Sequence, residues 1–189
     1  MNQKIIAFRA KWEKGEIGRQ LKKGYKNSPD KDSNAREKYE NVKLRMRDLS
    51  KVLYLLYNIY DKNKELYGEK FYAFVGNEVV RNWPHLDLPF ESVNYSNETV
   101  GIYEHFTPIS FFRDLLDEPN MTEQDFYDAL LYFHRVVKIS KNENKTLDSS
   151  KYKSRRPFNA YEQLGIKIKE TEHWNSIYGE LDAQIKKNN

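Results

Sequence analysis

The sequence predicts a mostly α-helical protein, a helical bundle flanked by basic, partly flexible N- and C-terminal segments. Large aliphatic side chains are concentrated between Val42 and Val137, where many recur at helical spacings, whereas residues 15–38 and 138–157 hold few of them. A chain of 189 residues with 39% hydrophobic residues builds a core only if those residues are gathered in this way. The apolar middle is therefore the predicted core.

Charge divides the chain at nearly the same places. Lys and Arg outnumber Asp and Glu by 14 to 6 over residues 1–47 and by 11 to 7 over residues 138–189, but are outnumbered 7 to 15 over residues 48–137. Basic ends around an acidic middle favour polyanion binding or docking to a partner of opposite charge. We expect four parts: a basic N-terminal arm (1–33), a helical core (34–137), a basic loop (138–158) and a C-terminal helical segment (159–189).

Helices are expected at both sides of a short linker near the N-terminus. Ile5, Phe8 and Trp12 lie at helical spacing, which predicts one or two short basic helices over residues 3–26, followed by a linker over residues 27–34. A long helix follows from residue 35 and ends near Gly68. Its core face repeats every three or four residues through Val42, Met46, Leu49, Leu53, Leu56 and Tyr60, and is widened by Val52, Leu55 and Ile59.

The second half of the core is expected to hold three more helices. A helix over residues 69–82 precedes a long loop over residues 83–107, which holds at most a short strand near residues 100–103. Thr107 before Pro108 predicts a helix start, and Thr122 with Asp125 predicts a capping box that opens a helix through Val137. A charged loop over residues 138–157 then leads to a last helix over residues 170–187.

Several classes of protein are excluded or disfavoured by composition. Cysteine is absent, which excludes disulfides, thiolate zinc sites and a cysteine nucleophile and favours a cytoplasmic protein. No apolar run approaches the roughly 18 residues of a membrane span, so no membrane association is expected. Heavy use of Lys, Asn, Tyr and Ile is typical of AT-rich genomes, including those of phages and mobile elements.

Local spacing predicts neither a metal site nor a cofactor. The chain has four histidines, His85, His105, His134 and His173, and no two of them lie three or four residues apart. The best local pair is His85 with Asp87. No glycine-rich phosphate loop or catalytic triad motif is present. We therefore predict no metal, no cofactor and no catalytic residue.

The segment from Arg81 to His85 resembles the Arg-polar-spacer-His motif of the helical HEPN ribonucleases, and the resemblance implies RNA cleavage. Three residues separate Arg81 from His85, where that family usually has four to six. Pro84 also interrupts the helix that should carry both residues. Ribonuclease activity is left as an alternative, and the protein is expected to be noncatalytic.

Basic residues interleaved with aromatic ones predict the main function. Cations neutralise phosphates and aromatic rings stack on unpaired bases, a combination that favours RNA or single-stranded DNA over sequence-specific duplex. We predict a noncatalytic nucleic-acid-binding accessory or regulatory protein. The expected contacts are Arg9, Lys11, Trp12, Arg19, Lys22 and Lys23 in the N-terminal arm, and Lys151, Tyr152, Lys153, Arg155 and Arg156 in the basic loop.

An acidic helical hairpin supports the alternative function. Residues 108–116 and 122–137 have the proportions of a helix-turn-helix, but the acidic residues around its turn would repel phosphates. Asp117, Glu118 and Asp128 are instead expected to form a docking face for a basic protein. The alternative is therefore a protein-binding inhibitor or a small helical subunit of a larger nucleoprotein assembly.

Overall fold

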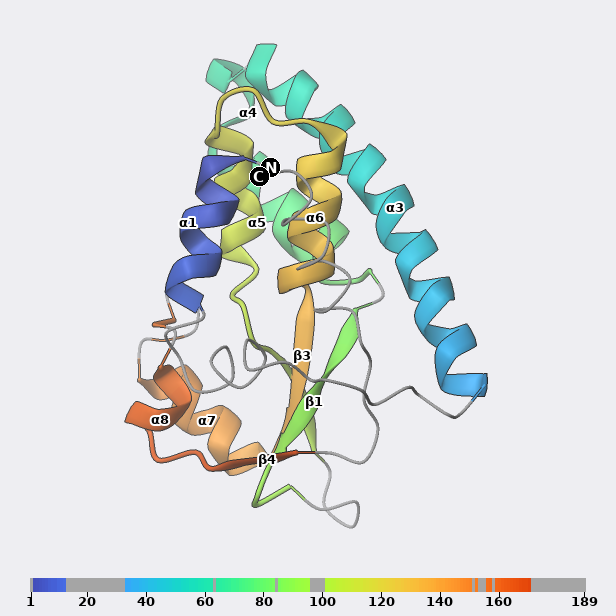
Figure 1. Ribbon diagram of the computed structural model, residues 1–189. Coiled ribbons are helices and arrows are strands. Elements are labelled where there is room, and N and C mark those ends of the chain that lie inside the picture. The colour runs from blue at the N-terminus through green and yellow to red at the C-terminus, as the bar shows by residue number, and fades with distance from the viewer. Residues whose placement is uncertain are drawn as a thin grey trace.

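A four-stranded mixed sheet forms the lower half of the molecule in Figure 1, and most of the helices lie above it. The computed structural model describes residues 2–12, 33–62, 64–83, 85–95, 101–150, 152, 156–157 and 159–170. Seven α-helices accompany the sheet within these ranges. The protein is therefore a mixed α/β protein, and the prediction of a mostly α-helical bundle is wrong.

Four strands build the sheet in the order β2-β3-β1-β4. The two central strands, β1 (Leu86–Ser92) and β3 (Arg135–Ile139), run parallel, and Leu86 pairs with Arg135. The outer strands, β2 (Ile102–His105) and β4 (Ile168–Glu170), are antiparallel to β3 and β1 respectively. Two of these strands, β1 and β2, lie in the segment that was expected to be a long loop; β2 overlaps the short strand expected near residues 100–103, whereas β1 was not expected.

Strand β3 replaces the last turn of an expected helix. Helix α6 (Glu123–Phe133) ends at His134, and β3 begins at the next residue. Val136, Val137 and Ile139 are at most 1% exposed in the sheet. Side chains branched at Cβ fit a pleated, buried surface better than a helix, so tertiary packing overrides the helical spacing of Val137.

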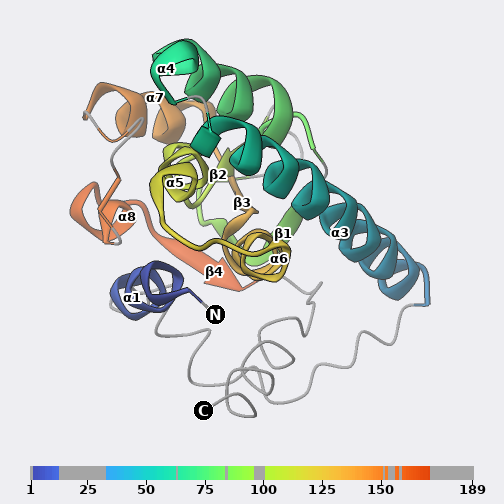
Figure 2. The same cartoon turned by 90° about the horizontal axis from the view of Figure 1, so that it is seen from above.

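Helix α3 (Ser33–Lys62) supplies the predicted core face on one side only. Met46, Leu49 and Leu53 are fully buried, as the heptad spacing predicts. Leu55 is 60% exposed and Ile59 37%, so the predicted widening of the buried face is wrong. Helix α3 packs along α6, and its N-terminal half extends past the rest of the molecule in Figures 1 and 2.

The next segment continues as α4 (Lys64–Ala73) and a π-helix, η1 (Phe74–Val80). Gly68 has φ +46°, a left-handed conformation that interrupts the helical path where a helix end was expected. Gly76 in η1 allows close packing, because a Cβ there would lie 2.8 Å from Cδ of Arg113 on α5. Both glycines thus shape the layer that covers one end of the sheet.

The helical hairpin is present, with one start corrected. Helix α5 (Ser110–Asp114) continues as a 3₁₀-turn, η2 (Leu115–Asp117). Its N-cap is Ile109, so the predicted cap at Thr107 is wrong; Thr107 is buried instead. The predicted capping box at Thr122 is confirmed, because its hydroxyl accepts from the Asp125 amide at 3.1 Å.

The segment predicted as a basic loop contains a helix. After β3, α7 (Lys141–Ser149) begins at a second capping box in which Ser140 pairs with Glu143, and Leu147 is fully buried. A short helix, α8 (Ala160–Gln163), follows and leads into β4. The prediction of a flexible arm is thus wrong for residues 138–150.

Helix α1 (Gln3–Trp12) confirms a helix within the predicted range 3–26, and it packs against the core, although the N-terminal segment was expected to be partly flexible. Ile5 is 1% exposed, and the Phe8 ring stacks on Phe111 with their centroids 3.9 Å apart. Figure 1 shows α1 alongside α5. Residues 13–32 and 171–189, including the predicted second basic helix and last helix, lie outside the described ranges. No helix within those ranges combines the length and apolar character that a membrane crossing requires.

Candidate metal centre

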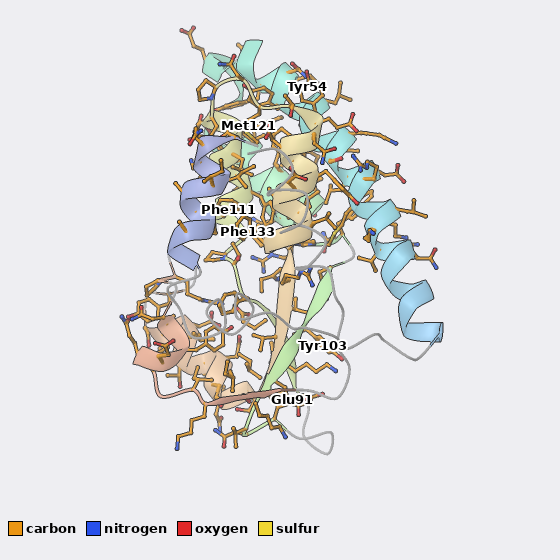
Figure 3. The ribbon with its side chains drawn as sticks, viewed as in Figure 1. Tyr54, Glu91, Tyr103, Phe111, Met121 and Phe133 are labelled. Carbon is orange, nitrogen blue, oxygen red and sulfur yellow. The ribbon has the colours of Figure 1, made fainter. Side chains whose placement is uncertain are left out.

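Three histidines meet at one end of the central strands. His85 comes directly before β1 and His134 directly before β3, and these parallel strands are neighbours, so both histidines reach the same edge. His105 ends the antiparallel β2 and pairs with Val136, two residues beyond His134. Figure 3 labels Phe133, which precedes His134, where α6 meets β3. The sheet topology therefore gathers side chains that are 20 or more residues apart in sequence.

The geometry of this histidine cluster (His85, His105 and His134) is close to that of a metal site. One ring nitrogen from each residue lies within 4.8 Å of the other two. Nitrogens bound to tetrahedral zinc at 2.0–2.1 Å are about 3.4 Å apart. The three nitrogens are therefore close together, though the 4.8 Å limit is wider than the spacing in a formed tetrahedral zinc site.

Hydrogen bonding fixes the tautomer of His134. Its Nε2 lies 3.2 Å from the carbonyl oxygen of Trp83, which only accepts, so Nε2 carries the hydrogen and Nδ1 keeps its lone pair. A carbonyl that orients the distal N–H in this way is a usual feature of histidine ligands. Nδ1 of His134 and Nε2 of His105 are buried and form no hydrogen bond with any residue in the described ranges.

Burial also keeps two of these imidazoles neutral. Burial, followed by the nearby His85, Arg81 and Arg156, lowers the pKa of His105 to about 4. Burial, followed by His105, lowers the pKa of His134 to about 3 despite its bond to Trp83. At neutral pH both rings therefore offer lone pairs, the form in which histidine binds metals.

Arg156 holds the strand that carries His105. Its Nη1 donates to the His105 carbonyl oxygen at 2.7 Å, and its Nη2 pairs with the Glu104 carboxylate. The Arg156 side chain is only 3% exposed. Its guanidinium is therefore committed to the end of β2 and is not available for the nucleic-acid contact predicted for it.

The other predicted nucleic-acid contacts are placed only in part. Tyr152 packs against the core and donates from its hydroxyl to Gln163 at 2.6 Å. Arg9, Lys11 and Trp12 lie on α1, with side chains outside the description. Lys151, Lys153, Arg155, Arg19, Lys22 and Lys23 lie outside the described ranges. The structure thus does not gather these residues into one described surface.

The three predicted docking residues do not form one exposed face. Asp117 is exposed and accepts a hydrogen bond from the Tyr72 hydroxyl at 2.5 Å. Glu118 forms an ion pair with Lys4 of α1 at 2.7 Å. Asp128 is only 7% exposed and accepts from Gln124. The acidic hairpin therefore receives the chain's own N-terminal helix over part of its surface.

Arg81 and His85 are not carried by one helix, in contrast to the ribonuclease motif. Arg81 follows η1 and His85 precedes β1, with a turn between them. His85 contributes to the histidine cluster instead. Sequence spacing missed this cluster because its members come from three separate strand ends. Two of those strands, β1 and β3, were not predicted.

Comparisons with known proteins do not alter this description. No family model, curated protein or solved structure matches the chain.

Proposed function

We propose that the protein binds one first-row transition-metal ion, with zinc as the reference ion, through His85, His105 and His134. The observation that supports this function is the convergence of three imidazole nitrogens within 4.8 Å. Imidazole ligands suit zinc, copper, iron and nickel, whereas magnesium and calcium prefer oxygen ligands. Among the described side chains the cluster holds imidazoles and no carboxylate, which favours the transition metals.

Three protein ligands leave one position of a tetrahedral zinc ion for a further ligand. This complement is typical of catalytic zinc sites, in which a bound water molecule has its pKa lowered to about 7. The chain's own residues supply the ligands and their orientation: Trp83 orients His134, and Arg156 holds the backbone of His105. That the protein is noncatalytic stays a prediction.

The direct test is a zinc titration of the metal-free protein, read by competition with a chromophoric chelator. We expect one zinc ion per chain. His85→Gln, His105→Gln and His134→Gln should each weaken zinc binding at least about 100-fold, because loss even of groups that only orient ligands costs 10–100-fold. His85 and His105 are half-buried, so their variants keep the test valid if His134→Gln fails to fold.

Ser92→Ala is the matched control. Ser92 is fully buried at the far end of β1 and donates to Glu143 at 2.6 Å, so its loss should lower stability without touching the cluster. Wild-type zinc affinity in Ser92→Ala, beside weak binding in the histidine variants, would support the site. Unchanged affinity in all three histidine variants would exclude it.

We also propose, from the charge segregation of the sequence, that the basic ends bind RNA or single-stranded DNA. Changing Lys151, Lys153 and Arg155 together to Ala should lower the salt slope of binding by about 2 to 3, since each phosphate contact contributes roughly 0.7–0.9. Arg156 is omitted because it is buried and ion-paired. Equal affinity and slope in this triple variant would remove the basic segment from the binding surface.

The docking alternative rests mainly on Asp117. Of its three predicted residues, Glu118 is ion-paired with Lys4 and Asp128 is buried. Asp117→Lys alone should then abolish co-purification with a basic protein partner if such a face exists. Retention of that partner by Asp117→Lys would refute the alternative.

A further inference from the structure

A row of four side chains crosses the whole sheet on one face. Tyr103 of β2 pairs with Lys138 of β3. Glu91 of β1 pairs with Lys138 on one side and with Lys169 of β4 on the other. Residues paired directly across neighbouring strands point to the same face of a sheet. These four residues therefore form one line, here called the sheet row, and Figure 3 labels two of its members, Tyr103 and Glu91.

The face that carries the sheet row is open to solvent. Tyr103 is 53% exposed, and the side chain of Lys169 is 50% exposed. The opposite face is packed, because Val137 and Ile139, on either side of Lys138, are fully buried. Successive side chains of a strand point to opposite faces, so the core lies behind the sheet row. The row is thus a surface on which a ligand can lie.

Aromatic and charged groups follow one another along the sheet row. The ammonium nitrogen of Lys138 lies 5.5 Å from the centre of the Tyr103 ring, within the range of a cation–π contact. The ammonium nitrogen of Lys169 lies 3.1 Å from the Glu91 carboxylate. Exposed Lys167 adds a cation beside this end of the row, since its carbonyl oxygen accepts from the first amide after β1 at 2.9 Å. Three lysines therefore accompany one carboxylate among the described side chains of the row and the residues beside it.

We infer that the sheet row binds single-stranded RNA, with a base stacked on Tyr103, a phosphate beside Lys138 and a ribose 2′-hydroxyl on Glu91. The inference rests on the proposed nucleic-acid function, which it deepens, and does not depend on the metal site. Stacking on an aromatic ring holds an unpaired base, and lysines neutralise the phosphates of the strand. Four-stranded sheets bind single-stranded RNA through exposed aromatic residues in this way.

Two features of the sheet row select single-stranded RNA over other nucleic acids. The bases of a duplex are stacked on one another, so the Tyr103 ring meets a free base face only in an unpaired strand. Glu91 repels phosphates, yet its carboxylate accepts from the 2′-hydroxyl, a donor that DNA lacks. Neighbouring strands lie about 4.8 Å apart, so the four positions span about 14 Å. The row thus offers groups for base, sugar and phosphate in one line.

Fluorescence anisotropy with a labelled oligouridylate of about 16 nucleotides tests the stacking. Tyr103→Ala should weaken binding about 5- to 150-fold, the value of one base stacked on an aromatic ring, without lowering the salt slope of binding. Tyr103→Phe keeps the ring and should bind as the wild type does. Phe74→Ala is the matched control, because Phe74 on η1 is 48% exposed, and it should also keep wild-type affinity. Wild-type affinity in Tyr103→Ala would overturn the inference.

The same assay distinguishes RNA from DNA. We expect the wild-type protein to bind oligouridylate about tenfold or more tightly than oligodeoxyuridylate of the same length, the value of one hydrogen bond to a charged acceptor. Glu91→Met keeps the length of the side chain and removes its carboxylate oxygens, so the two affinities should become nearly equal. Equal affinity of the wild-type protein for the two strands would overturn the assignment to RNA. An unchanged preference in Glu91→Met would overturn the role of Glu91.

The remaining outcomes separate this inference from the proposed function. Failure of the wild-type protein to bind oligouridylate would overturn both. Wild-type affinity in Tyr103→Ala, beside weak binding when Lys151, Lys153 and Arg155 are changed together, would overturn the inference and leave the basic segment as the binding surface. A loss of duplex RNA binding in Tyr103→Ala as large as the loss of single-stranded binding would overturn the stacking of an unpaired base.

Discussion

Glu143 joins three parts of the fold through one buried carboxylate. Its Oε2 accepts hydrogen bonds from the Ser92 hydroxyl at 2.6 Å, the Ser140 hydroxyl at 2.8 Å and the Ser140 amide at 2.9 Å. Its Oε1 accepts from the Asn94 amide group at 2.9 Å. The end of β1, the residues after it and the start of α7 therefore meet on a side chain that is 7% exposed.

Replacing Glu143 with Gln keeps the shape of the side chain and removes its charge. A hydrogen bond to a charged group contributes about 1.5–3 kcal/mol, and a neutral one about 0.5–1.5 kcal/mol, so each bond that loses its charge costs about 1 kcal/mol. Three bonds converge on Oε2, and a glutamine carbonyl oxygen can occupy that place; the glutamine NH2 group then replaces Oε1 and cannot accept from the Asn94 amide group. We expect Glu143→Gln to lower the free energy of unfolding at pH 7 by at least about 3 kcal/mol.

The same carboxylate makes this loss depend on pH. Burial alone would raise the pKa of Glu143, but the bonds from Ser92, Ser140 and Asn94 outweigh burial and hold the pKa below its ordinary value. A carboxylate of this kind stabilises the fold fully above the pKa of unfolded glutamate, about 4.3, and the contribution is lost as pH falls through the folded pKa. The gap between wild type and Glu143→Gln should therefore shrink in acid.

Urea unfolding followed by circular dichroism measures both effects. The two proteins are compared at pH 7 and again below pH 4, with Asp148→Asn as the control, because Asp148 is exposed on the same helix. The control should stay within about 0.5 kcal/mol of wild type, the usual range for a surface change. A loss below about 1 kcal/mol at pH 7 in Glu143→Gln, or a loss that does not change with pH, would refute the reasoning.

Three further predictions follow from burial and from the metal site. Leu53→Ala should lower the free energy of unfolding, measured with urea, by about 2–5 kcal/mol, because Leu53 is fully buried. Leu55→Ala should lower it by less than about 0.5 kcal/mol, because Leu55 is 60% exposed on the same helix. Equal losses in the two variants would contradict the packing of α3. In the same assay Ile5→Ala should lower the free energy of unfolding by about 2–5 kcal/mol, since Ile5 is 1% exposed. Lys4→Ala should lower it by no more than about 1 kcal/mol, since the ion pair of Lys4 is partly solvated. An Ile5→Ala protein as stable as wild type would mean that α1 is not part of the core. Zinc at 100 times its dissociation constant should raise the free energy of unfolding of the wild-type protein by about 2.7 kcal/mol in urea unfolding. The stability of His134→Gln should hardly change under the same conditions. Equal stabilisation of both proteins would mean that zinc binds elsewhere.

Local chemistry decided the features that the sequence predicted correctly. The capping box at Thr122 depends on residues three positions apart, and the buried stripe of α3 depends on a helical repeat that Met46, Leu49 and Leu53 follow. Gly68 marks a break because only a glycine adopts a left-handed conformation without cost. Each of these signals acts within one or two helical turns, so no tertiary information was needed to find it.

The sheet was decided by contacts between segments far apart in the chain. Strand β1 lies in a segment interrupted by Pro84 and Pro89, and its central position comes from pairing with β3, about 50 residues later. Val136 and Val137 continue the spacing of α6, yet they lie in β3 because the sheet buries them completely. The local periodicity of a sequence does not report pairing between distant strands, so the sheet was missed and the predicted helical-bundle fold class was wrong.

The histidine cluster and the fate of the charged residues also depended on the tertiary fold. By itself the sequence determined which residues carry imidazole or charge, where helices begin, and that cysteine ligands are absent. Only the parallel pairing of β1 with β3 and the return of β2 brought His85, His105 and His134 to one edge. Arg156 was predicted to contact phosphate, but the tertiary fold places it in a buried ion pair with Glu104. The sequence does not show this, because the contacts of a guanidinium depend on which residues lie near it in the folded chain.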